Sequence, residues 1–353
     1  MSKAMLYTYS EEIEDSEVAL LEEILENYDI KYSHVEKVRS AYRITTEDHR
    51  SYCLKMLGRG YKRAKKSYFL STALQERGFD HVAAYQYTTE GDYLIKESKS
   101  SFYVTDWIDG GEVSFKSVED ILDSARFLAD FHLKAKGLEF PERIKIRNRH
   151  GTWLENFISC IEDVKTFERK IRKKSSLSGF DIIYLNNVTS FKEEAELALR
   201  LLNTEEAKRA FKGAEEERYL CHDSFYYQNI LRDQAGQLYL IDLESSLLDS
   251  PMSDLGKLIR RILCKHKFQW DFDLCRRIID AYDSVRPISR DELYPLLAMI
   301  AFPHKFWKFG RKRYIKKKKW PELDFQNKLR KIMILQNEKR EFIKNFVMFY
   351  RIT

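Results

Sequence analysis

The spacing of hydrophobic residues changes about a third of the way along the chain. Before that point, short strand-like and helix-like stretches alternate. Residues 16–28 and 64–79 have apolar positions at helical intervals, and Gly78 stands where a helix of this kind ends. Residues 81–98 predict a hairpin that turns at Glu90 and Gly91. Strands are predicted for the stretches KVRSAYRITT (37–46), RSYCLKML (50–57) and SFYVTDWI (101–108).

Beyond the glycine pair at 110–111, helical patterns dominate to the end of the chain. The first has apolar residues at three- and four-residue steps, which predicts a core-facing helix: Val118, Ile121, Leu122, Ala125, Leu128, Ala129 and His132. Only residues 220–244 interrupt the helices, with a loop and the strand QLYLIDLE. The pattern therefore predicts a sheet-rich lobe over 1–107 and a larger helical lobe over 108–353, with a ligand cleft between them.

Composition narrows the class of protein. The 353 residues are 44% hydrophobic and 33% charged, as in a folded globular chain of about two lobes. The net charge of +6 is mild, so nucleic acid is not the expected partner. The five cysteines are scattered without zinc or disulfide spacing, which favours a reducing compartment. We see no secretory signal and no apolar run long enough for a membrane span, so we expect synthesis in the cytoplasm.

Three residues have the types that phosphoryl transfer requires. Lys55 lies on a predicted strand, and Asp242 ends another. Asn229 lies 13 residues before Asp242, which leaves room for a strand, a turn and a return strand. Such enzymes need a cation on the nucleotide phosphates, and a carboxylate and an amide oxygen on Mg²⁺. For Asp242, the simpler alternative is that it caps a neighbouring helix.

The segment CHDSFYYQNIL (221–231) has the layout of a catalytic loop with one residue out of place. In such loops a histidine stands two positions before an acidic base, and an asparagine five positions after it. His222 and Asn229 keep this spacing, but the position of the base holds Ser224. Asp223 stands one place early. We expect His222 to fix the loop by hydrogen bonds.

The order and wording of these pieces resemble the aminoglycoside-phosphotransferase branch of the protein-kinase-like fold. The similar pieces are Lys55 with TDWIDGGE, LADFH, CHDSFYYQNIL, YLIDLE and SPMSDLGKLIRR. Within that branch, the stretches at 239–263 and 302–321 resemble the CotS family of bacterial spore coat proteins, over roughly residues 17–346. The resemblance implies an α+β, bilobal fold with a small sheet-rich N-lobe, a larger helical C-lobe and a catalytic-loop-like segment at 220–244.

The resemblance also implies roles for single residues. Lys55 becomes the phosphate-contacting lysine of an ATP site, and Asn229 and Asp242 become the Mg²⁺ ligands. The hinge strand that faces the adenine becomes Asp106, Trp107 and Ile108. Glu76 is the only acidic residue of its predicted helix, near the helix end, and is the candidate partner for Lys55.

Two functions follow from the departures, because Ser224 is no base and the turns RSAYRITTEDHR lack the glycines that cover phosphates. The first is a spore coat protein with a structural or assembly role and a degenerate, pseudokinase-like site, made in the mother-cell cytoplasm and assembled into the coat with other coat proteins. The alternative is an ATP- and Mg²⁺-dependent phosphotransferase, with Asp223 as a shifted base, acting on a hydroxyl of a small molecule, a sugar or polysaccharide, or a coat component. Losing both base and glycines favours the first.

Three further features have simpler interpretations. The basic run at 311–319 either binds a polyanion, an acidic substrate or a coat protein, or is a solvated helix face. His132 is expected to be a hydrogen-bonded core histidine. Ser253 is expected to cap a helix, or Asp254 to favour its dipole.

Overall fold

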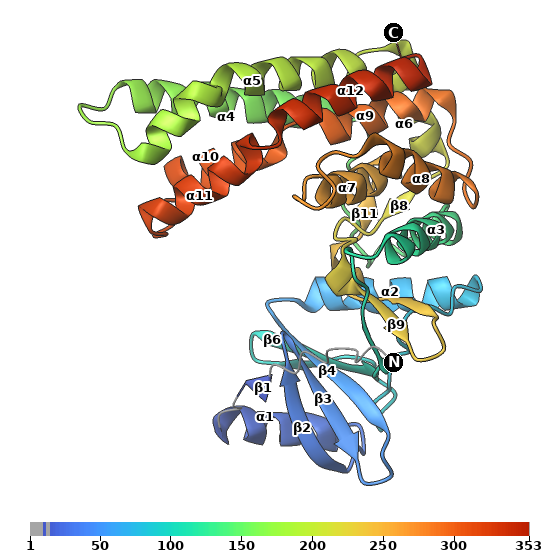
Figure 1. Ribbon diagram of the computed structural model, residues 1–353. Helices are drawn as coiled ribbons and strands as arrows, with labels where there is room; N and C mark the ends of the chain where they lie inside the picture. Colours follow the sequence, from blue (N-terminus) through green and yellow to red (C-terminus); the bar gives the residue numbers. More distant parts are fainter. Residues whose placement is uncertain (1–9, 12–14, 353) are drawn as a thin grey trace. The chain divides into compact units, whose positions relative to one another are not determined.

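The computed structural model describes residues 10–11 and 15–352 and forms two compact units (Figure 1). Unit 1 takes in the chain up to Ser114, Leu138–Arg147 and His222–Ser246. Unit 2 takes in Phe115–Gly137, Asn148–Cys221 and the chain from Leu247. The predicted α+β class is confirmed, with a sheet-rich N-terminal part and a helical C-terminal part.

Unit 1 is built on a six-stranded antiparallel sheet in the order β1-β2-β3-β4-β6-β5. One face is covered by α1 (Asp15–Glu26), whose Leu21, Ile24 and Leu25 are buried against sheet residues such as Ile44. The packing of α1 on the sheet buries a continuous layer of apolar side chains, and this burial is the main contribution that holds the helix to the sheet. The strands are β1 (Ser10–Glu11), β2 (Tyr32–Val38), β3 (Ala41–Thr46), β4 (Ser51–Gly58), β5 (Ile95–Glu97) and β6 (Ser100–Asp106).

Two strand predictions need correction. Residues 37–46 are not one strand, because the chain reverses at Arg39 and Ser40 so that Val38 pairs with Ala41. Arg39 has a φ of 57°, a left-handed conformation that glycine and asparagine adopt more readily. Because the residue at this position is an arginine, the sequence did not predict a turn there. Residues 81–98 do turn between Thr88 and Asp92. However, β5 pairs with β6 and not with the first arm of the turn.

A second, three-stranded sheet extends unit 1. It pairs β7 (Gly110–Glu112) with β9 (Ile230–Asp233), and β9 with β10 (Leu238–Leu240). Residues 220–244 were predicted to belong with the helical lobe. The structure groups His222–Ser246 with unit 1 because β9 hydrogen-bonds to β7. The helix α2 (Tyr61–Glu76) also belongs to unit 1.

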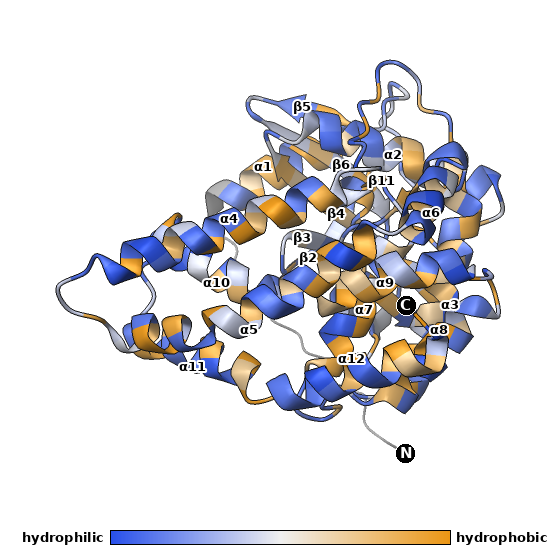
Figure 2. Cartoon of the chain, turned by 90° about the horizontal axis from the view of Figure 1, so that it is seen from above, coloured by the Kyte–Doolittle hydropathy of each residue, from blue (hydrophilic) through white to orange (hydrophobic). Residues whose placement is uncertain are grey.

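Unit 2 is helical, and its centre is α9, a short helix in which every residue is buried. It packs against α5 and α7, and this apolar environment explains why the helix has no polar face. The other helices carry both hydrophobic and polar residues along their length, as α4 does in Figure 2. The helices are α3 (Val118–Ala135), α4 (Trp153–Arg172), α5 (Gly179–Leu202), α6 (Glu205–Glu216), α7 (Met252–Leu263), α8 (Phe272–Asp283), α9 (Leu293–Ala301), α10 (His304–Tyr314), α11 (Glu322–Met333) and α12 (Gln336–Tyr350).

Short elements complete the two units. In unit 2, β8 (Leu220–Cys221) pairs with β11 (Leu247–Leu248), and a 3-10 turn, η3, spans Arg290–Glu292. In unit 1, two 3-10 turns flank the β9–β10 hairpin: η1 (Tyr227–Asn229) and η2 (Leu243–Ser245). None of the helices described is long and apolar enough to cross a membrane.

The core helix predicted from the spacing around residue 125 is present as α3. Ile121, Ala125, Leu128 and His132 are all fully buried, as the stripe predicted. Ser117 caps the helix by accepting a hydrogen bond from the backbone N–H of Asp120.

The helix α10 lies unusually close to its neighbours because of one glycine. A Cβ at Gly310 would lie 2.6 Å from the ring of Phe167 on α4 and would also meet the Tyr184 hydroxyl of α5. Any larger residue would therefore push α10 away from these helices. α10 thereby packs against α4 and α11.

Candidate functional site

Lys55 is the centre of a buried charge cluster in unit 1. It lies on β4, between β3 and β6, and is 9% exposed. Its ammonium pairs with the carboxylate of Asp242 and lies 2.9 Å from Oε1 of Glu244. Asp242 follows β10 in the left-handed conformation (φ 66°), which turns the chain into η2. This turn brings two carboxylates, two residues apart, to the same amine.

The charges of this cluster stabilise one another. Burial would lower the pKa of Lys55, but the carboxylates of Glu244 and Asp242 raise it above its ordinary value. Burial would raise the pKa of Glu244, but Lys55 and the hydroxyl of Tyr103, which donates to Glu244, hold it below its ordinary value. Lys55 and Glu244 are therefore both charged near neutral pH.

Asn229 is held beside Asp242 by the β9–β10 hairpin. The backbone N–H of Ile241 donates to the carbonyl of Asn229 over 3.0 Å, so the two ends of the hairpin meet. The Nδ2 of Asn229 donates to the backbone oxygen of Ser224 at 3.0 Å and lies 3.3 Å from its hydroxyl. Because the nitrogen is directed at the loop, Oδ1 is the atom that Asn229 offers to a metal.

The oxygen donors of this site fit a hard divalent cation. Mg²⁺ prefers carboxylate and carbonyl oxygens together with substrate phosphates. Asn229 supplies an amide oxygen and Asp242 a carboxylate, whose side chain is 39% exposed. The alternative that Asp242 only caps a helix is not supported, since among the described residues its side chain makes no capping hydrogen bond to η2.

The catalytic-loop segment keeps its architecture without the carboxylate. His222 is fully buried, and its Nε2 lies 2.9 Å from the carbonyl of Ile241, which confirms its predicted structural role. Ser224 occupies the position of the base, and its hydroxyl interacts with Asn229. Asp223 is left-handed (φ 64°) and forms an ion pair with Arg147 over 3.1 Å. The one carboxylate in the loop is thus engaged with a cation.

The turn that would cover phosphates is short. It consists of Arg39 and Ser40 between β2 and β3, with no glycine. The guanidinium of Arg39 lies 2.5 Å from the carboxylate of Glu112 on β7. A turn of two non-glycine residues offers fewer backbone N–H groups to phosphates than a glycine-rich loop does.

The helix α2 supplies a lysine to this part of unit 1. Lys66 is buried, and its ammonium donates to the carbonyl of Ser246 over 2.6 Å. Burial, and after it the charge of Arg147, lowers the pKa of Lys66 to about 8. Glu76 is exposed at the last residue of α2, and the carboxylates beside Lys55 come from Asp242 and Glu244.

Sequence reasoning missed Glu244 because it sought the partner of Lys55 on the helix, where kinases carry it. The signal was present in YLIDLE, where a second acid follows Asp242 by two residues. Only the left-handed conformation of Asp242 brings Glu244 to the same lysine, and the sequence does not show that conformation. Lys66 was missed because a lysine on a helix usually lies in water.

The predicted hinge residues lie at the end of β6, next to the strand that carries Lys55. Asp106 pairs with Tyr52 of β4, and its carboxylate accepts a hydrogen bond of 2.7 Å from Gln86. Burial raises the pKa of Asp106. The N–H of Trp107 donates to the carbonyl of Ser51 over 3.1 Å. The adenine-facing role of Asp106, Trp107 and Ile108 stays a prediction.

Unit 2 contains a separate buried polar cluster. His132 is fully buried, with Nδ1 2.6 Å from the Tyr282 hydroxyl, as expected of a core histidine. Asp254 lies 3.6 Å from the other ring nitrogen of His132. Ser253 lies inside α7, which begins at Met252, so the predicted Ser253 cap is wrong, while Asp254 does lie in the first turn.

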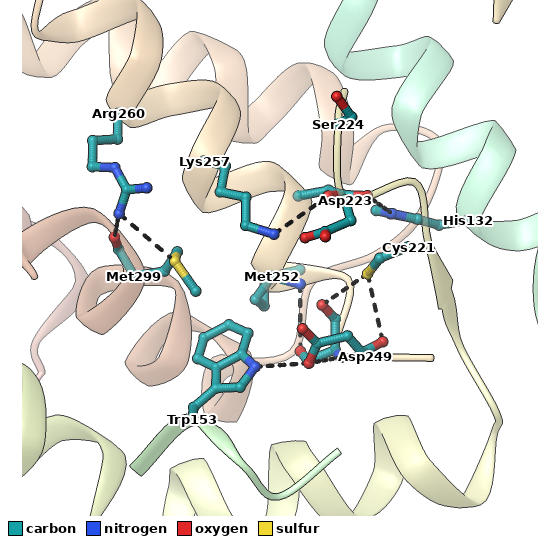
Figure 3. Close-up of polar contacts among 12 residues, drawn as sticks. His132, Trp153, Cys221, Asp223, Ser224, Asp249, Met252, Lys257, Arg260 and Met299 are labelled. Carbon is teal, nitrogen blue, oxygen red and sulfur yellow. Dashed lines mark hydrogen bonds and ion pairs between the residues drawn. The ribbon is translucent and has the colours of Figure 1, made fainter. Parts of the chain in front are cut away.

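The same cluster does not make a zinc site. Cys221, His132 and Asp254 bring three ligand atoms within 4.8 Å of one another. The thiol of Cys221 donates to the carbonyl of Ser250 at 3.2 Å (Figure 3). Structural zinc takes four ligands, and these three groups are already engaged by the protein. We therefore assign the cluster to the core.

The fold of this chain is the kinase-like fold of the aminoglycoside phosphotransferases. A solved aminoglycoside phosphotransferase from Alicyclobacillus acidocaldarius is 20% identical with a TM-score of 0.83, covering 93% of this chain and 95% of its own. Spectinomycin phosphotransferase APH(9)-Ia is 14% identical with a TM-score of 0.65, covering 94% and 99%.

The sequence comparisons narrow this class to a family. The chain belongs to the family described as spore coat putative kinase YutH, whose model matches residues 21–346. Spore coat protein S of Bacillus subtilis (strain 168) is 25% identical over 342 residues, which is 96% of both chains. The resemblance inferred from the sequence is confirmed.

Proposed function

We propose that this chain is a structural component of the spore coat whose kinase-like site binds a nucleotide with Mg²⁺ but transfers phosphate poorly. The observation that carries the proposal is the hydrogen bonding between Asn229 and Ser224. The loop is built around a serine where a base would stand, whereas Lys55 and Asp242 remain together.

The residues divide the work as follows. Lys55 exchanges its carboxylate partners for phosphate oxygens and orients the nucleotide. Asp242 and Asn229 would hold Mg²⁺, which would neutralise charge on the phosphates. Ser224 accepts no proton at neutral pH, because a hydroxyl is a far weaker base than a carboxylate.

The size of each loss decides between poor and absent transfer. A general base contributes on the order of 10²–10⁴-fold to a rate. Positioning and charge neutralisation supply most of the rest in phosphoryl transfer. The turn at Arg39 is short and has no glycine, so it should position the phosphates of a nucleotide less well than a glycine-rich loop. We therefore expect binding to survive and turnover to fall by at least the contribution of the base.

A second candidate is an ATP- and Mg²⁺-dependent phosphotransferase that uses Asp223 as its base. One observation favours it: the side chain of Asp223 is 18% exposed, so its carboxylate is not sealed in the core. The acceptor would be a hydroxyl of a small molecule, a sugar or polysaccharide, or a coat component. The ion pair with Arg147 counts against it, because a base must be free to take a proton.

Nucleotide binding can be tested by unfolding the protein at increasing MgATP concentrations. A ligand that binds only the folded state at 100 times its Kd stabilises it by about 2.7 kcal/mol, a rise of a few degrees in Tm. We expect this rise in the wild type and its loss in Asp242→Asn. Asp29→Asn is the matched control, because Asp29 is an exposed aspartate of unit 1 that is also left-handed (φ 51°). Equal shifts in both variants, or none in the wild type, contradict the proposal.

The two candidates separate by turnover. We expect slow turnover in the wild type that is unchanged in Asp223→Asn and Ser224→Ala, and a gain in Ser224→Asp. Turnover in the wild type that is lost in Asp223→Asn and kept in Ser224→Ala would establish the shifted base instead.

The coat role rests on the family and on the curated relative, which is named a spore coat protein. We expect this chain to assemble with other coat proteins after synthesis in the mother cell. A fluorescent fusion should therefore appear on the spore surface, and Asp242→Asn should appear there to the same extent if the role is structural. Loss of the variant from the coat would instead make nucleotide binding a condition of assembly.

A further inference from the structure

Unit 2 contains a cavity of about 780 Å³ that the kinase-like site does not use. Its walls come from α5, α7, α10, α11, α12 and Trp320, all within unit 2. This volume suits a small molecule, since ligand pockets commonly measure about 300–1,000 Å³. The cavity takes in part of the basic segment that the kinase-like site leaves unexplained.

The lining of the cavity is strongly basic. Glu194 is its only acidic residue, and it pairs with Lys339 over 2.6 Å. That pair leaves six of the seven basic lining residues without a carboxylate in the cavity wall. The seven are Arg260, Lys265, Lys305, Lys312, Lys328, Lys331 and Lys339.

Some of these cations are satisfied by neutral groups. Arg260 donates to the carbonyl of Met299 over 2.7 Å, as Figure 3 shows. Lys265 donates to the carbonyl of Phe115 over 3.3 Å, and Lys305 lies 2.9 Å from the sulfur of Cys264. Lys312 and Lys328 differ, because among the described residues their ammonium groups make neither a hydrogen bond nor an ion pair, and they contact aromatic rings instead.

Lys312 and Lys328 share an aromatic surface. Their ammonium groups lie 4.3 and 5.0 Å from the centre of the Trp320 ring. Lys312 also lies 5.6 Å from the centre of the Phe309 ring. Two cations on one indole repel each other, and an anion between them would relieve that repulsion while its apolar part covered the ring.

Burial and neighbouring positive charges together lower the pKa of titrating groups in the cavity. Burial, followed by the charges of Lys308 and Lys328, lowers the pKa of Lys312. Burial, followed by Arg260, also holds the pKa of His304 well below its ordinary range. The Nε2 of His304 is buried and makes no hydrogen bond within the described chain. These effects agree with a cavity that attracts anions and repels cations.

We propose that this cavity binds a small organic anion, with its acidic group on Lys312 and Lys328 and its aromatic or aliphatic body against Trp320. The acidic group is a carboxylate, phosphate or sulfonate, since all three present oxygens to ammonium groups. A long polyanion fits less well, because the exposed lysines at 316–319 that would track it lie outside the lining. The site is independent of the nucleotide proposed for unit 1.

The probe for this site is 8-anilinonaphthalene-1-sulfonate, an aromatic anion that fluoresces when bound. The matched neutral probe is N-phenyl-1-naphthylamine, which has the same rings without the sulfonate. We expect saturable binding of the anionic probe with a stoichiometry near one. The double variant K312Q/K328Q should weaken it by roughly tenfold or more, since each hydrogen bond to a charged group contributes a factor of this order.

The control variant is K316Q/K319Q, which removes the same charge from exposed lysines of the same segment. It should leave the anionic probe within about twofold of the wild type, since distant surface charges are screened by salt. The neutral probe should bind weakly and equally to all three proteins. Equal loss in both double variants would show that general surface charge attracts the probe, and it would overturn the proposal.

Two further variants test the aromatic wall. Trp320→Leu removes the ring on which both lysines lie, and Trp320→Phe keeps an aromatic surface there. We expect loss of binding in the first and partial retention in the second, with unchanged unfolding temperatures as the check on folding. Full binding of the probe by Trp320→Leu would contradict its assigned position against the ring. A second contradiction would be displacement of the probe by polyglutamate, if that displacement is lost in K316Q/K319Q.

Discussion

The charges around Lys55 in unit 1 and those around Trp320 in unit 2 are organised in opposite ways. In unit 1, one ammonium meets two carboxylates, and the hydroxyl of Tyr103 donates a hydrogen bond to one of them, that of Glu244. In unit 2, seven basic side chains line a cavity whose single glutamate pairs with one of them, Lys339. The basic group of unit 1 has carboxylate partners within the protein, whereas most basic groups of the unit 2 cavity have none in the cavity wall.

The difference shows what each region requires from a ligand. A nucleotide at the unit 1 site must replace the contact of Lys55 with Asp242, so binding exchanges one ionic partner for another. An anion in the unit 2 cavity replaces nothing and supplies missing charge. The unit 1 cluster should therefore contribute to stability without ligand, and the unit 2 cavity should gain stability when a ligand binds.

The largest expected effect breaks the balance in unit 1. Lys55→Met leaves Glu244 buried without its cation, which should cost about 3–5 kcal/mol of the free energy of unfolding. Lys37→Met is the control, because Lys37 is also a strand lysine in an ion pair, but its side chain is 23% exposed. It should cost less than about 1 kcal/mol. Urea unfolding measures both, and adding Glu244→Gln to Lys55→Met should recover part of the loss.

The next effect compares two buried carboxylates. Glu244 has a cation, whereas Asp249 in unit 2 accepts hydrogen bonds from neutral donors, the Trp153 indole at 2.7 Å and the Ser250 N–H at 2.8 Å (Figure 3). Burial raises the pKa of Asp249 from 3.8 to about 7. The folded state therefore binds a proton that the unfolded state has lost, and stability falls as the pH rises from about 4 to 7.

The full effect of Asp249 would be about 4 kcal/mol, since each pKa unit corresponds to 1.36 kcal/mol. Asp249→Asn keeps an acceptor for Trp153 and should lose less stability between pH 5 and pH 8. Glu244 has the opposite pH dependence, because its pKa is lower in the folded protein than its ordinary value of 4.5. It therefore stabilises the fold above about pH 4.5, and this contribution is lost as the pH falls. Unfolding curves at pH 5 and pH 8 measure how much stability each protein loses between these pH values. An equal loss in the wild type and Asp249→Asn would contradict the raised pKa of Asp249.

A smaller effect comes from the hydroxyl of Tyr103. Tyr103→Phe removes a hydrogen bond to the charged Glu244 and should cost about 1.5–3 kcal/mol. Tyr32→Phe removes a similar bond to Glu22, but on the exposed surface, and should cost less than about 1 kcal/mol. Equal costs would show that burial of Glu244 does not strengthen the bond.

How far the sequence led depends on where each partner comes from. Lys55, Asn229 and Asp242 were found because residue type and spacing place them on strands and at the ends of a hairpin. Glu244 and the turn at Arg39 were not found, because both depend on left-handed residues, Asp242 and Arg39 itself, that are not glycine. Local patterns do not show such conformations, since tertiary contacts impose them.

The basic segment shows the same limit in unit 2. From sequence, residues 311–319 suited either a solvated face or an anion site. The structure divides them: Lys312 is half-buried against Trp320, and Lys316–Lys319 are exposed. Which lysine turns inward depends on the close approach of α10 at Gly310 and on the return of the chain at Trp320, and neither has a sequence signature.

The central claim is that the phosphate and metal side of the kinase-like site is kept while its base is lost. The most direct test measures MgATP binding and γ-phosphate transfer or release in the same samples of wild type and Ser224→Asp. We predict equal binding by both proteins, and turnover at least about 10²-fold higher in Ser224→Asp. Wild-type turnover as fast as that of Ser224→Asp, or no nucleotide binding by either protein, would contradict the account.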